Sequence, residues 1–67
     1  MTDVRLLKEK IKETGLKKVY IAKQLGLTYQ GYLRKENGQS EFISSEISMM
    51  KDLLSLSLED VSDIFLQ

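Results

Sequence analysis

The sequence contains no cysteine and no histidine. Without cysteine the chain has neither a disulfide framework nor a thiolate metal site, and without histidine it has no imidazole for catalysis or for binding zinc. No apolar run approaches the roughly 20 residues that span a bilayer. The first ten residues, MTDVRLLKEK, also lack the apolar core of a signal peptide. We therefore expect a cytoplasmic protein that binds neither a metal ion nor a membrane.

Proline is absent as well, and the sequence has no repeat, no low-complexity stretch and no linker. Its 67 residues, of which 42% are hydrophobic and 30% charged, are typical of one small globular domain, here residues 1–67. The chain has no phosphate-binding loop and no carboxylate pair with a pocket in which to act. Together with the missing histidine and cysteine, this predicts a protein that is not an enzyme and uses no cofactor or small-molecule substrate.

Positive charge is concentrated in the first part of the chain. Residues 1–38 hold nine basic residues against four acidic ones, a net charge of +5, whereas residues 39–67 hold one lysine against six acidic residues, a net charge of −5. Such a separation is typical of a protein with a basic working face and an acidic remainder. Alternatively, both are ordinary solvated helix surfaces. We expect the carboxylates of the last two helices to face solvent.

No segment sustains the alternation of apolar and polar residues that predicts a strand. The spacing of apolar residues instead predicts five short helices. The first four lie near residues 3–14, 18–25, 28–36 and 44–54, and the fifth follows Ser57. Thr2 or Asp3, Thr28 and Ser57 are placed to cap helix N-termini, and Asp60 completes a capping box with Ser57. The expected fold is all-α, a compact bundle of five short helices.

Each predicted helix has one apolar face, and these faces predict the core. The expected core residues are Val4, Leu7, Ile11, Ile21, Ala22, Leu25, Ile47, Met50, Leu53 and Leu54, and the apolar positions of the fifth helix are Leu58, Val61, Ile64 and Phe65. In the loop 39–43, Phe42 is expected to insert into this core. Tyr32 stands at an inward position of the third helix, so we expect its ring to be buried and its hydroxyl to reach the surface.

The segment 17–38, KKVYIAKQLGLTYQGYLRKENG, contains two helical patterns joined by a very short turn at Gly26. Ala22 is small, so two helices can approach closely there, and Gly26 allows the chain to turn without strain at Cβ. Thr28 can cap the second helix, and Asn37-Gly38 tolerates positive φ at its end. This spacing predicts two helices that cross steeply, the geometry of a helix-turn-helix whose second helix fits the DNA major groove.

The chain resembles the lambda-repressor-like, or Cro/C1-type, helix-turn-helix proteins of phages and prophages. The matched residues are Ile21-Ala22, Leu25-Gly26-Leu27-Thr28, Gln30 and Asn37-Gly38 within the motif, Leu7, Ile11 and Leu16 before it, and Phe42, Ile47 and Leu53 after it. The resemblance implies a bacterial or phage-encoded transcriptional regulator that binds operator DNA sequence-specifically as a homodimer. Repression is the simplest activity of such a protein.

In proteins of this type the second motif helix places its N-terminal turn in the major groove. The resemblance therefore implies base contacts by Tyr29, Gln30, Leu33 and Arg34. Glutamine can pair with adenine, tyrosine can contact a thymine methyl group or a phosphate, and the arginine fork matches the two acceptors of guanine. For Arg34 the alternative is a phosphate contact or an ion pair with Glu36.

Phosphate contacts are expected from the start of the first motif helix and from both edges of the second. The expected residues are Lys17, Lys18, Thr28, Lys35, Asn37 and Gln39. Lys18 occupies the first motif position, where family members use a polar residue against the DNA backbone. Alternatively, each lysine is simply solvated. Gly31 and Tyr32 depart from the family pattern, which normally has Ile, Val or Leu at the position of Tyr32.

The last segment, LSLEDVSDIFLQ, has more apolar residues than one closing helix needs. This surplus predicts an interface between two copies of the chain, which would match a palindromic operator; alternatively, these residues complete the core. A second function is also open. The chain could keep the fold but act through its acidic half as a protein-interaction module of the antirepressor or toxin-partner type. Salt-dependent affinity for DNA separates these two functions.

Overall fold

Five helices follow one another in residues 1–66, the part of the chain that the computed structural model describes, and these residues form no strand. The helices are α1 (Val4–Thr14), α2 (Lys18–Gln24), α3 (Tyr29–Glu36), α4 (Ser44–Leu53) and α5 (Leu58–Phe65). The bounds of the first four lie within one residue of the predicted ones. The predicted all-α class is therefore confirmed, in a molecule of 27 × 23 × 21 Å.

Local hydrogen bonds set the helix starts. The Asp3 carboxylate accepts a backbone N–H of the first turn of α1, and the Thr28 hydroxyl oxygen accepts one from α3, each at 3.0 Å. At α5 the predicted capping box is present, because Ser57 and Asp60 each accept the backbone N–H of the other, at 3.0 and 3.1 Å. The Ser57 N–H holds the pKa of the Asp60 carboxyl below its usual range.

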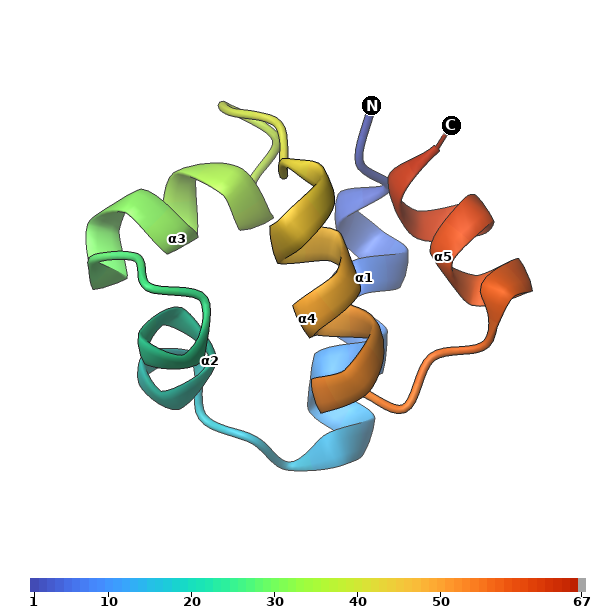
Figure 1. Cartoon of the computed structure of the whole chain (residues 1–67), viewed down its shortest axis with the longest axis horizontal. Helices are drawn as coiled ribbons and strands as arrows, with labels where there is room; N and C mark the ends of the chain where they lie inside the picture. The colour runs from blue at the N-terminus through green and yellow to red at the C-terminus, as the bar shows by residue number, and fades with distance from the viewer. Residues whose placement is uncertain (67) are drawn as a thin grey trace.

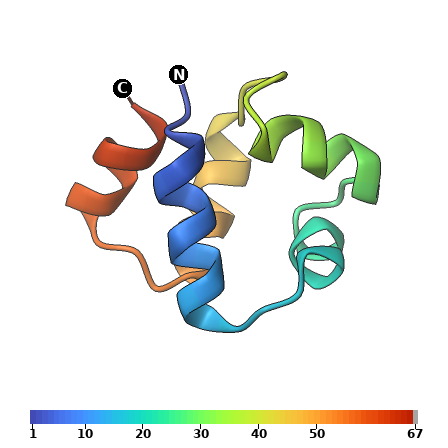
Figure 2. The same cartoon turned by 180° about the vertical axis from the view of Figure 1, so that it is seen from behind.

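In Figure 1, α4 passes in front of α1 in the middle of the molecule, with α2 and α3 on one side and α5 on the other. Figure 2 shows the same arrangement from behind, with α1 now in front. The two ends of the chain meet at one end of the molecule. There the backbone N–H of Asp3 donates to the carbonyl of Ile64 at 2.6 Å, which fixes the start of α1 against the end of α5.

All five helices contribute to one hydrophobic core. Its buried members are Leu7, Ile11, Ile21, Ala22, Tyr32, Phe42, Met50, Leu54, Leu56, Ile64 and Phe65. Phe42 inserts from the loop as predicted, and its ring packs edge-on against Phe65 at 5.3 Å and against Tyr32 at 6.3 Å between centroids. These contacts connect α3, the loop and α5 through one row of aromatic rings.

The apolar residues of the last segment divide between core and surface. Ile64 and Phe65 are buried, whereas Leu58 is 78% exposed and Leu66 is 67% exposed. Of the two alternatives open for this segment, Leu58 does not complete the core, because α5 is buried mainly through its C-terminal half. Its first turn lies at the edge of the molecule (Figure 1). Only part of this apolar segment therefore completes the core.

The turn between α2 and α3 is short and depends on one glycine. Gly26 has a φ of +73°, and the N–H of Leu27 donates to the carbonyl of Ala22 at 2.9 Å. In Figure 1, α2 is seen almost end-on while α3 runs across the page, so the two helices cross steeply. Ala22 is buried at this end of α2. The steep crossing and short turn agree with the geometry expected of residues 17–38.

Replacing Ala22 by methionine is expected to lower the free energy of unfolding by about 1–3 kcal/mol, because the added atoms have no free space in a packed core. Thermal and urea unfolding, followed by circular dichroism, measures the change. The matched control is Lys23→Met, which puts the same side chain at the exposed neighbouring position and should change stability by less than about 0.5 kcal/mol. Equal stability of the two variants would contradict tight packing around Ala22.

Candidate nucleic-acid interface

The outer face of α3 presents Gln30 and Arg34, whose side chains are exposed, while Tyr29 in the first turn is 43% exposed. The opposite face consists of Tyr32 and Glu36, and neither has any exposed surface. This division follows the helical period, since residues four apart lie on the same side of a helix. Two of the four predicted base-contacting residues, Gln30 and Arg34, therefore lie together on one surface.

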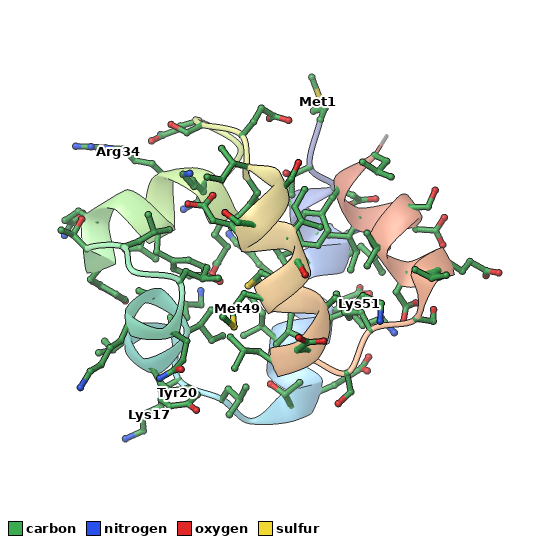
Figure 3. All side chains as sticks on the ribbon, viewed as in Figure 1. Met1, Lys17, Tyr20, Arg34, Met49 and Lys51 are labelled. Atoms are coloured by element: carbon green, nitrogen blue, oxygen red, sulfur yellow. The ribbon has the colours of Figure 1, made fainter. Side chains whose placement is uncertain are left out.

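Arg34 and Leu33 differ in how freely they can contact another molecule. Leu33, the fourth predicted base-contacting residue, is half-buried and packs against the core. The Arg34 side chain makes no ion pair and no hydrogen bond with any of residues 1–66, and the alternative pair between Arg34 and Glu36 does not form. In Figure 3 the Arg34 side chain extends away from the body of the molecule.

Side chains of α2 protrude on the same side of the molecule as Arg34. Figure 3 shows Lys17 and Tyr20 extending from α2 at the lower left, below Arg34, while Lys51 of α4 lies on the opposite side, near α5. Lys17 is exposed and has no carboxylate partner among the described residues. This side of α2 and α3 therefore combines positive charge with exposed polar and aromatic groups.

The other predicted phosphate-contacting residues occupy the two ends of α3. Thr28 at its start is exposed; its oxygen caps the helix, and its hydroxyl hydrogen remains available to donate. Gln39 is exposed just beyond the helix end. The Asn37 side chain is exposed but already occupied, since it donates to a backbone carbonyl of α3 at 2.9 Å and accepts from Nζ of Lys8 at 2.8 Å.

Lys18 and Lys35, also predicted to contact phosphates, instead bind carboxylates within the protein. Nζ of Lys18 lies 2.7 Å from Oε1 of Glu36, and Nζ of Lys35 lies 2.6 Å from Oε1 of Glu46. Glu46 also accepts the backbone N–H of Ile43 at the start of α4. Glu46 is buried, so the expectation that the carboxylates of the last two helices all face solvent is wrong for this residue.

The internal partners of Lys8, Lys18 and Lys35 were not predicted from the sequence, nor was the ion pair of Lys10 with Asp60. A signal for the two glutamates was nevertheless present in the helical spacing. Glu36 stands four residues after the inward Tyr32, and Glu46 stands four residues before the inward Met50. A carboxylate at such a position is expected to be buried and paired. The spacing does not indicate which of the ten basic residues is the partner.

Tyr32 differs from its prediction in one respect. Its ring is buried as expected, but the hydroxyl is buried too, beside the Glu36 carboxylate, and makes no hydrogen bond of ordinary geometry with residues 1–66. The expectation that this hydroxyl reaches the surface is therefore wrong. The side chain stays inside the bundle, where its ring packs against Phe42. Burial raises the pKa of the Tyr32 phenol far above its usual value, and the nearby Glu36 carboxylate raises it further.

Gly31 leaves room for the cap of α3. A Cβ atom at this position would meet the Thr28 hydroxyl oxygen at 3.0 Å, and that oxygen accepts the Gly31 N–H. The absence of a side chain lets this hydrogen bond form without crowding. Glycine at position 31 thus has a local structural reason, the cap that Thr28 provides.

Other kinds of site are not evident in the described residues. A shallow hollow of about 150 Å³ between α2 and α4 is lined by Gln24, Leu25, Ser45, Glu46 and Met49. No three or more acidic side chains of residues 1–66 gather in a way that could hold a metal ion. Among the same residues, every helix is too short or too polar to cross a membrane.

Comparisons of this chain with protein-family models, with curated proteins and with solved structures found no match.

Replacing Tyr32 by phenylalanine is expected to leave the free energy of unfolding unchanged or to raise it by up to about 1 kcal/mol. A buried hydroxyl without a partner is destabilising by about 1–3 kcal/mol, and its removal leaves only a small gap. Urea unfolding tests this, with Tyr20→Phe at a half-exposed position as the matched control. A loss of more than about 1 kcal/mol would mean that the hydroxyl makes a stabilising hydrogen bond.

Proposed function

We propose that this chain is a sequence-specific DNA-binding transcriptional regulator, with α2 and α3 as its helix-turn-helix. One observation carries the proposal: the outer face of α3 exposes Gln30 and Arg34, and Arg34 has no partner within residues 1–66. The inner face of the same helix is fixed in the core. A rigid helix with an unpaired arginine and a glutamine on its outer face suits major-groove recognition.

The spacing on α3 suggests which bases are read. Gln30 and Arg34 are one helical turn apart, which is about 6 Å along the helix axis. Successive base pairs are about 3.4 Å apart along one strand, so the two side chains can reach bases about two steps apart. In the proposed complex Gln30 pairs with adenine and Arg34 with guanine, while Tyr29 contacts a thymine methyl group or a phosphate.

Contacts with the DNA backbone would fix the position of α3 in the groove. Lys17 approaches from the start of α2, and Thr28 and Gln39 approach from the two ends of α3. Lys8 of α1 is held beside the end of α3 by its hydrogen bond to Asn37 and adds a positive charge there. Such contacts set register and orientation, and the base contacts supply the sequence preference.

Assembly into a homodimer on DNA is part of the proposal. Leu58 and Leu66 are large exposed apolar residues of the last segment, and together they offer a surface for a second copy. A two-fold dimer would place two copies of α3 on two half-sites of a palindromic operator. Repression by occupying the operator is the simplest mechanism, and it follows from the Cro/C1-type resemblance.

A second candidate function uses the same surface of α5. The exposed residues Glu59 and Asp63 stand beside Leu58 and Leu66, so this surface combines apolar and acidic side chains. That combination suits a basic protein partner, as in a protein-interaction module of the antirepressor or toxin-partner type. Affinity for duplex DNA decides between the two functions.

The test begins with selection of preferred duplexes from a random library, followed by fluorescence anisotropy with the selected duplex and a scrambled competitor. We expect salt-sensitive binding with a clear preference for the selected duplex. Arg34→Ala and Gln30→Ala should each weaken that binding by about 1–3 kcal/mol, roughly 5- to 150-fold, because each removes a bidentate base contact. Each should also relax the preference at one base pair.

Lys51→Ala is the matched control for these variants. It removes one positive charge from the side of the molecule opposite Arg34, as Figure 3 shows. This variant should bind the selected duplex as the unaltered protein does. An equal loss in Lys51→Ala and Arg34→Ala would contradict reading by α3. A folded protein that binds no duplex at low salt would contradict DNA binding and favour the protein-interaction module.

A further inference from the structure

Two ion pairs connect the last turn of α3 to two different helices. Glu36, the last residue of α3, binds Lys18 at the start of α2 with Nζ and Oε1 2.7 Å apart. Lys35, its neighbour in sequence, binds Glu46 in the first turn of α4 at 2.6 Å. Consecutive residues of α3 thus carry opposite charges, one toward α2 and the other toward α4.

The two carboxylates are the buried members of these pairs. The Glu36 side chain is 0% exposed and that of Glu46 is 8% exposed, against 40% for Lys18 and 17% for Lys35. A buried carboxylate is strongly unfavourable without a cation at hydrogen-bond distance. Each lysine therefore has a role inside the folded protein before any other molecule binds.

Glu36 depends on its lysine more than Glu46 does. The only side-chain hydrogen bond that Glu36 makes with residues 1–66 comes from Lys18, and its second oxygen, Oε2, is buried without a partner. Glu46 has a further donor, the backbone N–H of Ile43. Loss of Lys18 would leave Glu36 buried and uncompensated, so a test at Glu36 is the more sensitive one.

We infer that Lys18 and Lys35 are positioning residues that hold α3 in place as counter-ions of Glu36 and Glu46, and that they do not neutralise DNA phosphates. The part about phosphates rests on the proposed DNA-binding function. The charge of each lysine is already compensated by a carboxylate at hydrogen-bond distance, so a phosphate that contacts the lysine gains little, and one that displaces the carboxylate leaves it buried without a cation. A pair with no net charge displaces no counterion from DNA.

Basic side chains other than Lys18 and Lys35 must then supply the electrostatic part of DNA binding. Between residues 17 and 36, the basic residues without a carboxylate partner among residues 1–66 are Lys17, just before α2, Lys23 of α2 and Arg34 of α3, and all three are exposed. Each phosphate contact contributes about 0.9 to the slope of log affinity against log salt concentration. The slope should therefore depend on these residues and be independent of Lys18.

The first experiment measures the salt slope by anisotropy for three proteins: the unaltered chain, Lys17→Gln, and the double variant Lys18→Gln/Glu36→Gln. The double variant removes the buried pair without leaving either charge alone, so it can fold where Lys18→Gln alone fails. Lys17→Gln should reduce the magnitude of the slope by about 0.9 per bound subunit, and the double variant should leave it unchanged. A reduction in the double variant as large as in Lys17→Gln would overturn the inference.

The second experiment needs no DNA. Urea unfolding of Lys18→Gln, Glu36→Gln and the double variant forms a double-mutant cycle, with Lys17 and Glu36 as the control cycle. Lys18→Gln should lower the unfolding midpoint strongly, whereas Lys18→Arg and the double variant should recover most of the loss. The control cycle should be additive. A Lys18→Gln protein as stable as the unaltered chain would overturn the positioning role.

The two experiments separate failure of the inference from failure of the proposed function. If the unaltered chain is folded but binds no duplex at low salt, the proposed function is wrong. The unfolding cycle would then still decide whether Lys18 holds α3 through Glu36.

Discussion

The position of α3 depends on a carboxylate that has no exposed surface. Glu36 is buried at the end of this helix, where an ionised group requires a cation within hydrogen-bond distance, and Lys18 supplies it from the start of α2. The turn at Gly26 joins the end of α2 to the start of α3. A covalent turn at one end and an ion pair at the other fix α2 and α3 relative to each other. Tyr32, one turn before Glu36, is buried in the core, where its ring packs against Phe42.

The burial of one face of α3 determines which side chains its opposite face exposes to solvent. Because Tyr32 and Glu36 point inward, the helical period directs Gln30 and Arg34 to solvent. The zero net charge of the chain does not argue against a basic working face, because charge is distributed unevenly. Two lysines of the motif are neutralised by buried glutamates, whereas Lys17 and Arg34 keep unpaired charges on one side of the molecule. Local charge, more than the total, supports the proposed DNA-binding role.

Most of the secondary structure could be predicted because its determinants are local. The caps at Asp3, Thr28 and Ser57 bond to backbone groups three residues away. Glycine at position 26 ends α2 by adopting positive φ. The core was also largely predictable, since helical spacing marks the inward faces. The position of Leu58 stayed open, because spacing gives the side of a helix and does not show how far the neighbouring elements extend along it.

By itself, the sequence determined the five helices, the side-chain caps of three of them, the short turn between α2 and α3, and the exposed Gln30 and Arg34 of α3. Only the tertiary structure decided which charges meet. Lys18 and Glu36 are 18 residues apart, and Lys8 and Asn37 are 29 apart, so no local pattern connects them. Whether a lysine binds an internal carboxylate or remains unpaired depends on how whole helices pack.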